Sequence, residues 1–283
     1  MITQRLFDQY NINTNKDLQI KKRCPRPFDT ILIDKNGSCY ACECTSWLPQ
    51  SIGNLQIKSL TDIIGSDSCN LRCPSCRKGM IFHKEGSAYN LGIRLADRIN
   101  EWLYNHKHPI QVHIGSDGDP FASHVYRHFM EQTPERDNIK YSILTNGLMF
   151  KEFHTKVPYV INNLQELGVS IDGASKDTYE KLRLGGKWDK ILEGLECMAE
   201  QKQKHGFRFI LHMVVQQDNW HELEDMLALG RRYEADRVYF NKIEDWNTNI
   251  NFDLQTFMKL EEFKDSLRQV STDPLSHNNV ISV

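Results

Sequence analysis

Long apolar runs are missing from this chain of 283 residues. No uninterrupted apolar stretch of about 18 residues is present, and the N-terminal sequence MITQRLFDQYNINTNKDLQ lacks the apolar core of a secretory signal. An excess of one charge is missing too, because 35 Lys and Arg face 37 Asp and Glu. Composition therefore indicates neither a membrane nor a nucleic-acid partner, and we expect a soluble, cytoplasmic protein.

Cysteine is nearly absent from the C-terminal part of the chain. Seven of the eight cysteines lie within residues 24–76, and only Cys197 follows them. A chain of this length can bury a sizeable core without disulfides, so this clustering favours metal binding over cross-linking. Cys197, within an expected helix, is interpreted as a buried, inert thiol.

From about residue 58, short apolar runs alternate with amphipathic segments, which is typical of consecutive βα units with a parallel sheet. Strands are expected at Ser59–Ile64, Ile110–Gly115, Tyr141–Leu144, Val169–Asp172, Phe209–Val215 and Arg237–Asn241. Helices are expected at Leu91–Tyr104, Ala122–Gln132, Tyr179–Glu200 and Trp220–Tyr233. The predicted fold class is α/β, a partial (β/α)6 TIM-like barrel with a small N-terminal cysteine-rich module.

Three regions follow from these patterns. Residues 1–57 form a leader and the cysteine-rich module, and residues 58–245 form the partial barrel. Residues 246–283 are expected to hold one amphipathic helix, Phe252–Val270, followed by a polar, frayed tail from Ser271 to Val283.

Polar motifs follow nearly every expected strand. They are Cys69-x3-Cys73-x2-Cys76, Ser116-Asp117-Gly118-Asp119-Pro120, Thr145-Asn146-Gly147, Ser170 with Asp172, Gln216-Gln217-Asp218-Asn219, and Asn241 to Asp245. In parallel α/β folds, chemistry takes place in the loops beyond the carboxyl ends of the strands. The site is therefore predicted at that end of the sheet.

Three cysteines at this spacing can wrap one face of a [4Fe–4S] cluster and leave its fourth iron open to a small molecule. A closed structural zinc site takes four ligands, so the alternative is a zinc ion completed by a remote histidine or cysteine. Cys69, Cys73 and Cys76 on the loop after a first strand resemble the signature of radical S-adenosylmethionine (radical SAM) enzymes, although Ser75 replaces the usual aromatic residue.

That resemblance implies a cluster that binds S-adenosylmethionine and cleaves it reductively, giving a 5′-deoxyadenosyl radical that abstracts hydrogen from an unreactive carbon. It also implies which residues hold the cofactor. Ser116, Asp117, Gly118 and Asp119 resemble the motif that receives the methionine ammonium group, and Thr145-Asn146-Gly147 resembles a family turn.

Further positions come from later strands. Ser170 and Asp172 alternate, so both side chains are expected on one face, where matching family residues hydrogen-bond the ribose and the methionine carboxylate. Arg183 corresponds to a basic residue that can pair with that carboxylate. Asn219 is expected to approach the nucleoside, and Tyr239, Asn241 and Glu244 are candidates for substrate contact.

The N-terminal cysteines resemble the opening half of the SPASM or twitch extension of radical SAM enzymes. Cys24, Cys39, Cys42 and Cys44 are enough for a second [4Fe–4S] cluster, and a zinc knuckle is the alternative. A reducing partner such as flavodoxin or ferredoxin is implied.

Relatives with this extension frequently modify ribosomal peptides, so the leading hypothesis is crosslinking or epimerisation of a peptide by an oxidoreductase or isomerase. One alternative is dehydrogenation or epimerisation of a small carbohydrate or alcohol. Another is a non-enzymatic iron–sulfur or zinc protein.

Overall fold

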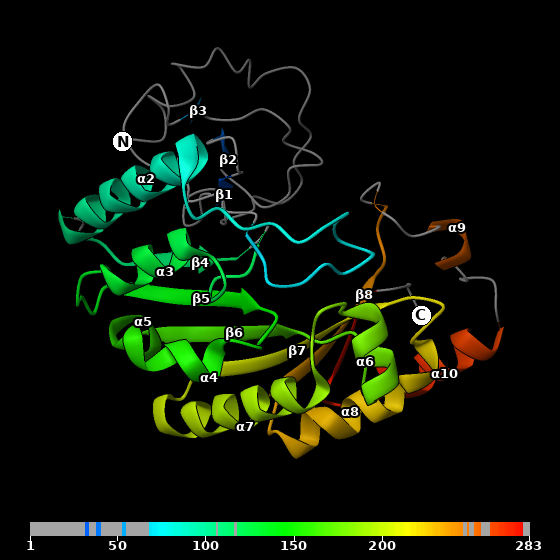
Figure 1. Ribbon diagram of the computed structural model, residues 1–283. Coiled ribbons are helices and arrows are strands. Elements are labelled where there is room, and N and C mark those ends of the chain that lie inside the picture. The colour runs from blue at the N-terminus through cyan, green and yellow to red at the C-terminus, as the bar shows by residue number, and fades with distance from the viewer. Residues whose placement is uncertain are drawn as a thin grey trace, which may run out of the picture. The chain divides into compact units, whose positions relative to one another are not determined.

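The computed structural model describes residues 68–105, 107–115, 118–245, 248, 252–255 and 261–279, and three short strands nearer the N-terminus (Figure 1). The chain divides into two compact units, Met1–Gly65 and Ser66–Val283. The functional roles predicted for the three regions of the sequence stay predictions.

In the first unit, strands β1 (Leu32–Ile33), β2 (Ser38–Tyr40) and β3 (Gly53–Asn54) form an antiparallel sheet in that order. Cys39 lies in β2, where its backbone pairs with Ile33 on one side and with Gly53 on the other. Cys24, Cys42 and Cys44 lie outside the described residues. The predicted second cluster therefore stays a prediction.

The second unit is built on a six-stranded parallel sheet, which confirms the predicted α/β class (Figure 1). Its strands lie side by side in chain order: β4 (Ile110–Ile114), β5 (Ile139–Thr145), β6 (Leu164–Ser170), β7 (Arg208–Val215), β8 (Arg237–Lys242) and β9 (Ser276–Asn279). Among the described strands, β4 and β9 do not pair with each other. The sheet is thus an open, partial barrel.

Helices connect the strands. They are α2 (Gly86–Asn105), α3 (His124–Glu131), α4 (Phe150–Phe153), η2 (His154–Lys156), α5 (Pro158–Asn162), α6 (Lys176–Leu182), α7 (Trp188–His205), η3 (Trp220–Glu222), α8 (Leu223–Arg232), α9 (Phe252–Gln255) and α10 (Glu261–Ser271). The single helix expected at Tyr179–Glu200 is two helices. Gly185, with φ +97°, and Gly186 lie in the break between α6 and α7, where left-handed backbone ends a helical path.

The two faces of the sheet differ in burial. On β7, Phe209, Leu211 and Met213 are fully buried, whereas His212 and Val214, on the opposite face, are partly exposed. Side chains alternate along a strand, so the first set packs under the helices and the second lies on the opposite face, here called the inner face. The core therefore lies mainly on the helix-covered face, although Ile210 of the inner face is buried too, and the inner face keeps polar groups within reach of a ligand.

The sequence makes a prediction about each margin of the sheet. Ser59–Ile64, predicted as the first strand, lies outside the described residues. The tail predicted to fray from Ser271 instead contains β9, which pairs in parallel with β8 from Val238 to Asn241. This segment is ordered because α10 before it is anchored by the buried Leu267 and Val270, and because Val238 N donates a backbone hydrogen bond to Leu275 O at 2.8 Å.

The helix expected at Phe252–Val270 is described as α9 and α10, with residues 256–260 outside the described part. Within the described ranges, no helix combines the length and the apolar character needed to cross a bilayer.

We predict that Gly115→Ala destabilises the fold much more than Gly206→Ala. Both glycines have left-handed backbone, with φ of +101° and +75°. A Cβ at Gly115 would lie 2.3 Å from the Leu144 carbonyl oxygen, whereas nothing stands within 4 Å of one at Gly206. We expect a loss of about 1 kcal/mol at Gly206, from backbone strain alone, and at least about 3 kcal/mol at Gly115, measured by urea unfolding. Equal losses would contradict the close approach of β4 and β5.

Candidate functional site

Cys69, Cys73 and Cys76, which lie on one loop, are free thiols, and backbone hydrogen bonds hold this loop in place. Cys69 donates its N–H to Ile81 O at 2.8 Å, and the N–H groups of Cys76 and Arg77 both donate to Cys73 O at 3.0 Å. A tight turn therefore joins Cys73 to Cys76. Cys69 and Cys73 are buried, and Cys76 is exposed.

Burial dominates the electrostatics of these thiols. It raises the pKa of Cys69 to about 11, with a further contribution from the charge of Asp119, and it raises the pKa of Cys73. Arg77 lies within electrostatic range of all three sulfurs, and its Nη2 is 3.6 Å from Cys76 Sγ. Deprotonated thiols would thus need a metal to stabilise them.

A [4Fe–4S] cluster with three protein ligands fits this donor set, because three free thiols lie on one loop beside a guanidinium. Among the described residues, no group of three His, Cys, Asp or Glu is gathered so as to hold a single metal ion. The ligand role of Cys69, Cys73 and Cys76 stays a prediction.

Asp119 joins three loops and is only 2% exposed. Its Oδ1 accepts the N–H groups of Phe121 and Ala122, both at 3.0 Å. Its Oδ2 accepts Thr145 Oγ1 and Asn146 N, both at 2.7 Å, while its own N–H donates to Ser68 O at 2.9 Å. Burial raises the pKa of Asp119 and these hydrogen bonds oppose the rise. Asp119 therefore ties the loop after β4 to the loop after β5 and to the start of the cysteine loop.

The other members of that motif are placed less fully. Gly118 is partly buried beside Asp119, whereas Ser116 and Asp117 lie outside the described residues. The predicted contact of this motif with a methionine ammonium group stays a prediction.

Asn146 reaches from the end of β5 to the cysteine loop. Its Nδ2 donates to Asn70 Oδ1 at 2.7 Å and lies 3.7 Å from Cys69 Sγ, and its Oδ1 accepts Leu148 N at 3.1 Å. Thr145 is buried and donates to Asp119. The Thr-Asn-Gly turn therefore lies against the thiols.

Arg183 and Asp172 form a buried ion pair next to Cys73. Arg183 Nη2 is 2.8 Å from Asp172 Oδ2, and its Nη1 lies 3.8 Å from Cys73 Sγ. Asp172 Oδ1 accepts Val214 N at 2.7 Å. Burial opposes the charge on Arg183, but Asp172 and Cys73 outweigh it and raise the pKa of the guanidinium. Within the described residues, Arg183 Nε is buried and without a hydrogen-bond partner, so one donor is left for a ligand.

Ser170 and Asp172 do not alternate along one strand. β6 ends at Ser170, and Asp172 lies beyond it with φ of +56°, in the left-handed region that Asp tolerates better than most residues. Ser170 pairs with His212 in the sheet register and is partly exposed, whereas Asp172 is buried. Only Ser170 lies on the inner face.

Asn219 is fully buried, and its amide binds backbone only. Its Nδ2 donates to Asp172 O and to Val214 O, both at 2.9 Å, and its Oδ1 accepts Gln216 N at 2.7 Å. The side chain therefore holds the loop after β7 against the loop after β6. The predicted approach of Asn219 to a nucleoside stays a prediction.

A row of side chains crosses the inner face. Ser170, His212, Tyr239 and His277 are in register on β6, β7, β8 and β9. The His212 and Tyr239 rings meet edge to face at 5.1 Å between centroids, and those of Tyr239 and His277 lie 4.5 Å apart. Asn241 Nδ2 is 3.3 Å from His212 Nδ1. Two predicted substrate residues, Tyr239 and Asn241, thus lie together, and Glu244 is exposed beyond the end of β8.

Sequence reasoning missed Glu222 and His277. Glu222 is a buried carboxylate in η3, three residues after Asn219. An acidic residue soon after a strand-end asparagine was a usable signal for it. His277 gave no signal because β9 itself was not expected.

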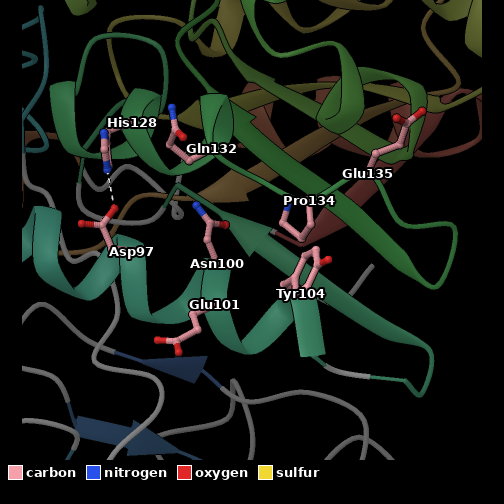
Figure 2. A pocket seen from close by; sticks show the side chains of 8 residues that line it. All are labelled: Asp97, Asn100, Glu101, Tyr104, His128, Gln132, Pro134 and Glu135. Carbon is pink, nitrogen blue, oxygen red and sulfur yellow. Dashed lines mark hydrogen bonds and ion pairs between the residues drawn. The ribbon is translucent and has the colours of Figure 1, made fainter.

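A polar groove lies elsewhere, between α2 and α3 (Figure 2). Asp97 and Asn100 of α2 face His128 of α3 across it, and His128 Nε2 is 2.6 Å from Asp97 Oδ1. None of the predicted site residues lines this groove. The candidate site is therefore the strand-end surface and not this groove.

Comparison with known proteins gives one family match. A family model described as Radical SAM superfamily matches residues 63–230. Among curated proteins, a GTP 3′,8-cyclase of Synechocystis sp. is 22% identical over 205 residues, which is 72% of this chain and 60% of the relative. A GTP 3′,8-cyclase of Alkaliphilus oremlandii is 25% identical over 136 residues, 47% of this chain and 41% of the relative. The chain thus spans less than two thirds of these relatives.

Solved structures share the fold. Streptococcus suis SuiB bound to precursor peptide SuiA matches with a TM-score of 0.53 and 14% identity, covering 76% of this chain and 47% of that one. Native anSMEcpe with bound AdoMet matches with a TM-score of 0.50 and 16% identity, covering 75% of this chain and 61% of that one.

We predict a pH-dependent stability that His212→Gln flattens. Burial, aided by the charge of Arg183, lowers the pKa of His212 to about 4, below its ordinary value of 6.5. The unfolded chain takes up this proton as pH falls through 6.5 and the folded chain does not until about pH 4. The contribution of His212 to the free energy of unfolding is therefore complete above pH 6.5, is lost as the pH falls from 6.5 to 4, and does not change further below pH 4.

Because one pKa unit corresponds to about 1.4 kcal/mol, we expect His212 to account for about 3.5 kcal/mol over the whole fall and for about 2 kcal/mol between pH 7 and pH 5. Urea unfolding at pH 7 and pH 5 would measure it in both proteins, with carboxylates contributing equally to each. An unchanged difference in His212→Gln would contradict the assignment.

Proposed function

Because this chain belongs to the radical SAM superfamily, we propose that it cleaves S-adenosylmethionine reductively and uses the product to abstract hydrogen from an unactivated C–H bond. The family implies a [4Fe–4S] cluster and S-adenosylmethionine. We assign the cluster to Cys69, Cys73 and Cys76. When bound, the two together supply an electron and a 5′-deoxyadenosyl radical, and the protein supplies placement and exclusion of water.

One observation supports this proposal most. The cysteine loop lies against Asp119, which follows β4, Asn146, which follows β5, and Arg183, which follows α6. A structural metal loop needs its ligands alone. Here polar groups from three separate segments of the chain converge on the thiols, as expected where a polar small molecule binds beside them.

Arg183 is proposed to receive the methionine carboxylate. Its guanidinium is held by Asp172 through Nη2, so it is fixed in direction, and its Nε has no partner among the described residues. The fixed guanidinium would thus offer a charge-assisted hydrogen bond without reorganising. Ser170, partly exposed on the inner face, is proposed for the ribose hydroxyls.

A peptide is proposed as the substrate, modified by crosslinking or epimerisation. The shared fold with SuiB, whose structure holds a precursor peptide, supports this choice. The inner face supports it too, because Tyr239 and the amide of Asn241, beside His212, are neutral hydrogen-bonding groups. Such neutral groups suit amides better than phosphates.

A nucleotide substrate is the second candidate, because two curated relatives are named GTP 3′,8-cyclase. The reaction would then be a ring closure, and not crosslinking or epimerisation of a peptide. The enzyme would accordingly be classed neither as an oxidoreductase nor as an isomerase. A small carbohydrate or alcohol is a third possibility. A second [4Fe–4S] cluster on Cys24, Cys39, Cys42 and Cys44, with an electron donor such as flavodoxin or ferredoxin, completes the proposal.

Release of 5′-deoxyadenosine tests the reaction. We predict that anaerobically reconstituted, reduced protein forms it from S-adenosylmethionine, and that Cys73→Ala lowers the rate at least ~100-fold because one cluster ligand is lost. Cys197→Ala is the matched control, since Cys197 lies on α7, 3.8 Å from His154 Nδ1. Equal rates in Cys73→Ala and the unmodified protein would refute the assignment, and so would zinc in place of iron.

The substrate is tested by what accelerates that release. We predict that a peptide encoded beside this gene raises the rate of 5′-deoxyadenosine formation at least tenfold, as substrate binding does when it commits the radical to a C–H bond. GTP and small polyols would be assayed in parallel by chromatography. Acceleration by GTP alone would reject the peptide and establish the nucleotide candidate.

A further inference from the structure

We infer that Glu222 is a positioning residue for cofactor binding, which acts on Arg183 through helix α6. This inference rests on the proposed function of the site. Glu222 ends η3, in the loop after β7, and its side chain turns toward the loop after β6. Its influence on a ligand at the thiols would therefore be indirect.

Four hydrogen bonds from the start of α6 reach this one carboxylate. Oε2 accepts Ala174 N at 2.6 Å and Ser175 N at 3.3 Å, and Oε1 accepts Ser175 Oγ and Thr178 Oγ1, both at 2.5 Å. Burial alone would raise the pKa of Glu222, but these bonds outweigh it and the pKa is lowered. The carboxylate is therefore ionised, and the first turn of α6 is fixed to η3.

The other end of α6 carries the site. Arg183 follows the last helical residue, Leu182, and its N–H donates to Tyr179 O at 2.8 Å. The next residue, Leu184, accepts Arg72 N from the cysteine loop at 3.0 Å. A helix of seven residues has little stability of its own, so its position depends on what holds its two ends.

Glu222 and Asn219 hold different parts of the same loop. Asn219 binds the backbone of Asp172, and Glu222 binds residues 174–178, so together they fix both partners of the Asp172–Arg183 pair. Without Glu222, two N–H groups and two hydroxyls lose their acceptor, and α6 can shift. Arg183 would then point its free Nε donor less consistently at a ligand.

A double-mutant cycle on the reconstituted protein tests this inference. We expect Glu222→Ala to weaken S-adenosylmethionine binding about tenfold, by equilibrium dialysis, with iron and sulfide content unchanged. In an Arg183→Ala background, Glu222→Ala should alter the affinity for S-adenosylmethionine less than twofold, because Glu222 is proposed to act only through Arg183. Equal effects in both backgrounds would overturn the inference.

Asp225→Asn, an exposed acid on the neighbouring helix α8, is the control for loss of one charge and should bind normally. Glu222→Gln keeps an oxygen for the two N–H groups and an amide for the two hydroxyls, so it should recover most of the affinity. If Glu222→Ala does not fold, Glu222→Asp takes its place in the cycle, because its shorter side chain reaches Ala174 and Thr178 less well. The same coupling with Arg183→Ala is then expected, and additive effects would refute the inference.

Hydrogen exchange on the protein without cofactor gives an independent readout. Amides of residues 173–183 should exchange at least tenfold faster in Glu222→Ala than in Asp225→Asn, and unchanged exchange would overturn the inference. Should the unmodified holoprotein not bind S-adenosylmethionine at all, the proposed function fails, whereas the exchange result still decides whether Glu222 holds α6.

Discussion

A guanidinium buried between a carboxylate and a thiol is the interaction on which the candidate site depends. Arg183 carries its charge almost out of contact with water, which is costly unless a partner of opposite charge is close. Asp172 is that partner, and its other oxygen is bound by the backbone of β7. The pair therefore fixes the end of α6 to the sheet and directs a cation at Cys73.

Carboxylates also join the strand-end loops to one another. Asp119 connects the loops after β4 and β5, Asp172 connects the loop after β6 to β7, and Glu222 connects the loop after β7 to α6. Each one accepts hydrogen bonds from a segment far away in sequence. Loops on a parallel sheet are usually its most variable parts, yet buried carboxylates join these loops to distant segments, as a preorganised site requires.

The regular part of the fold followed from periodicity. β7 and α7 carry apolar residues at the spacing that their secondary structure demands, so Phe209–Val215 and the helix from Trp188 were visible in the sequence. The break between α6 and α7 was harder, because amphipathic spacing continues across it and only the Gly185-Gly186 pair marks it. β9 could not be seen, since its residues are polar and are ordered by pairing with β8, which is distant in sequence.

The candidate site was predicted as a set of residues but not as a geometry. Cys73, Asn146 and Arg183 were identified by motif, and they lie together. The ligand contacts expected for the Asp119 motif and for Asn219 stay predictions, and the structure adds that both side chains are bound within the protein. Sequence order places a polar residue at a strand end, whereas its χ angles and its competing hydrogen-bond partners decide where it points.

The short polar strand at the margin of the sheet has a consequence for self-association. No described strand covers the outer side of β9, so its backbone presents N–H and C=O groups that a second molecule could pair with. β9 is four residues long and reads Ser-His-Asn-Asn, without an apolar side chain to make such pairing favourable. A brief, hydrophilic margin of this kind discourages the edge-to-edge stacking that leads to fibres.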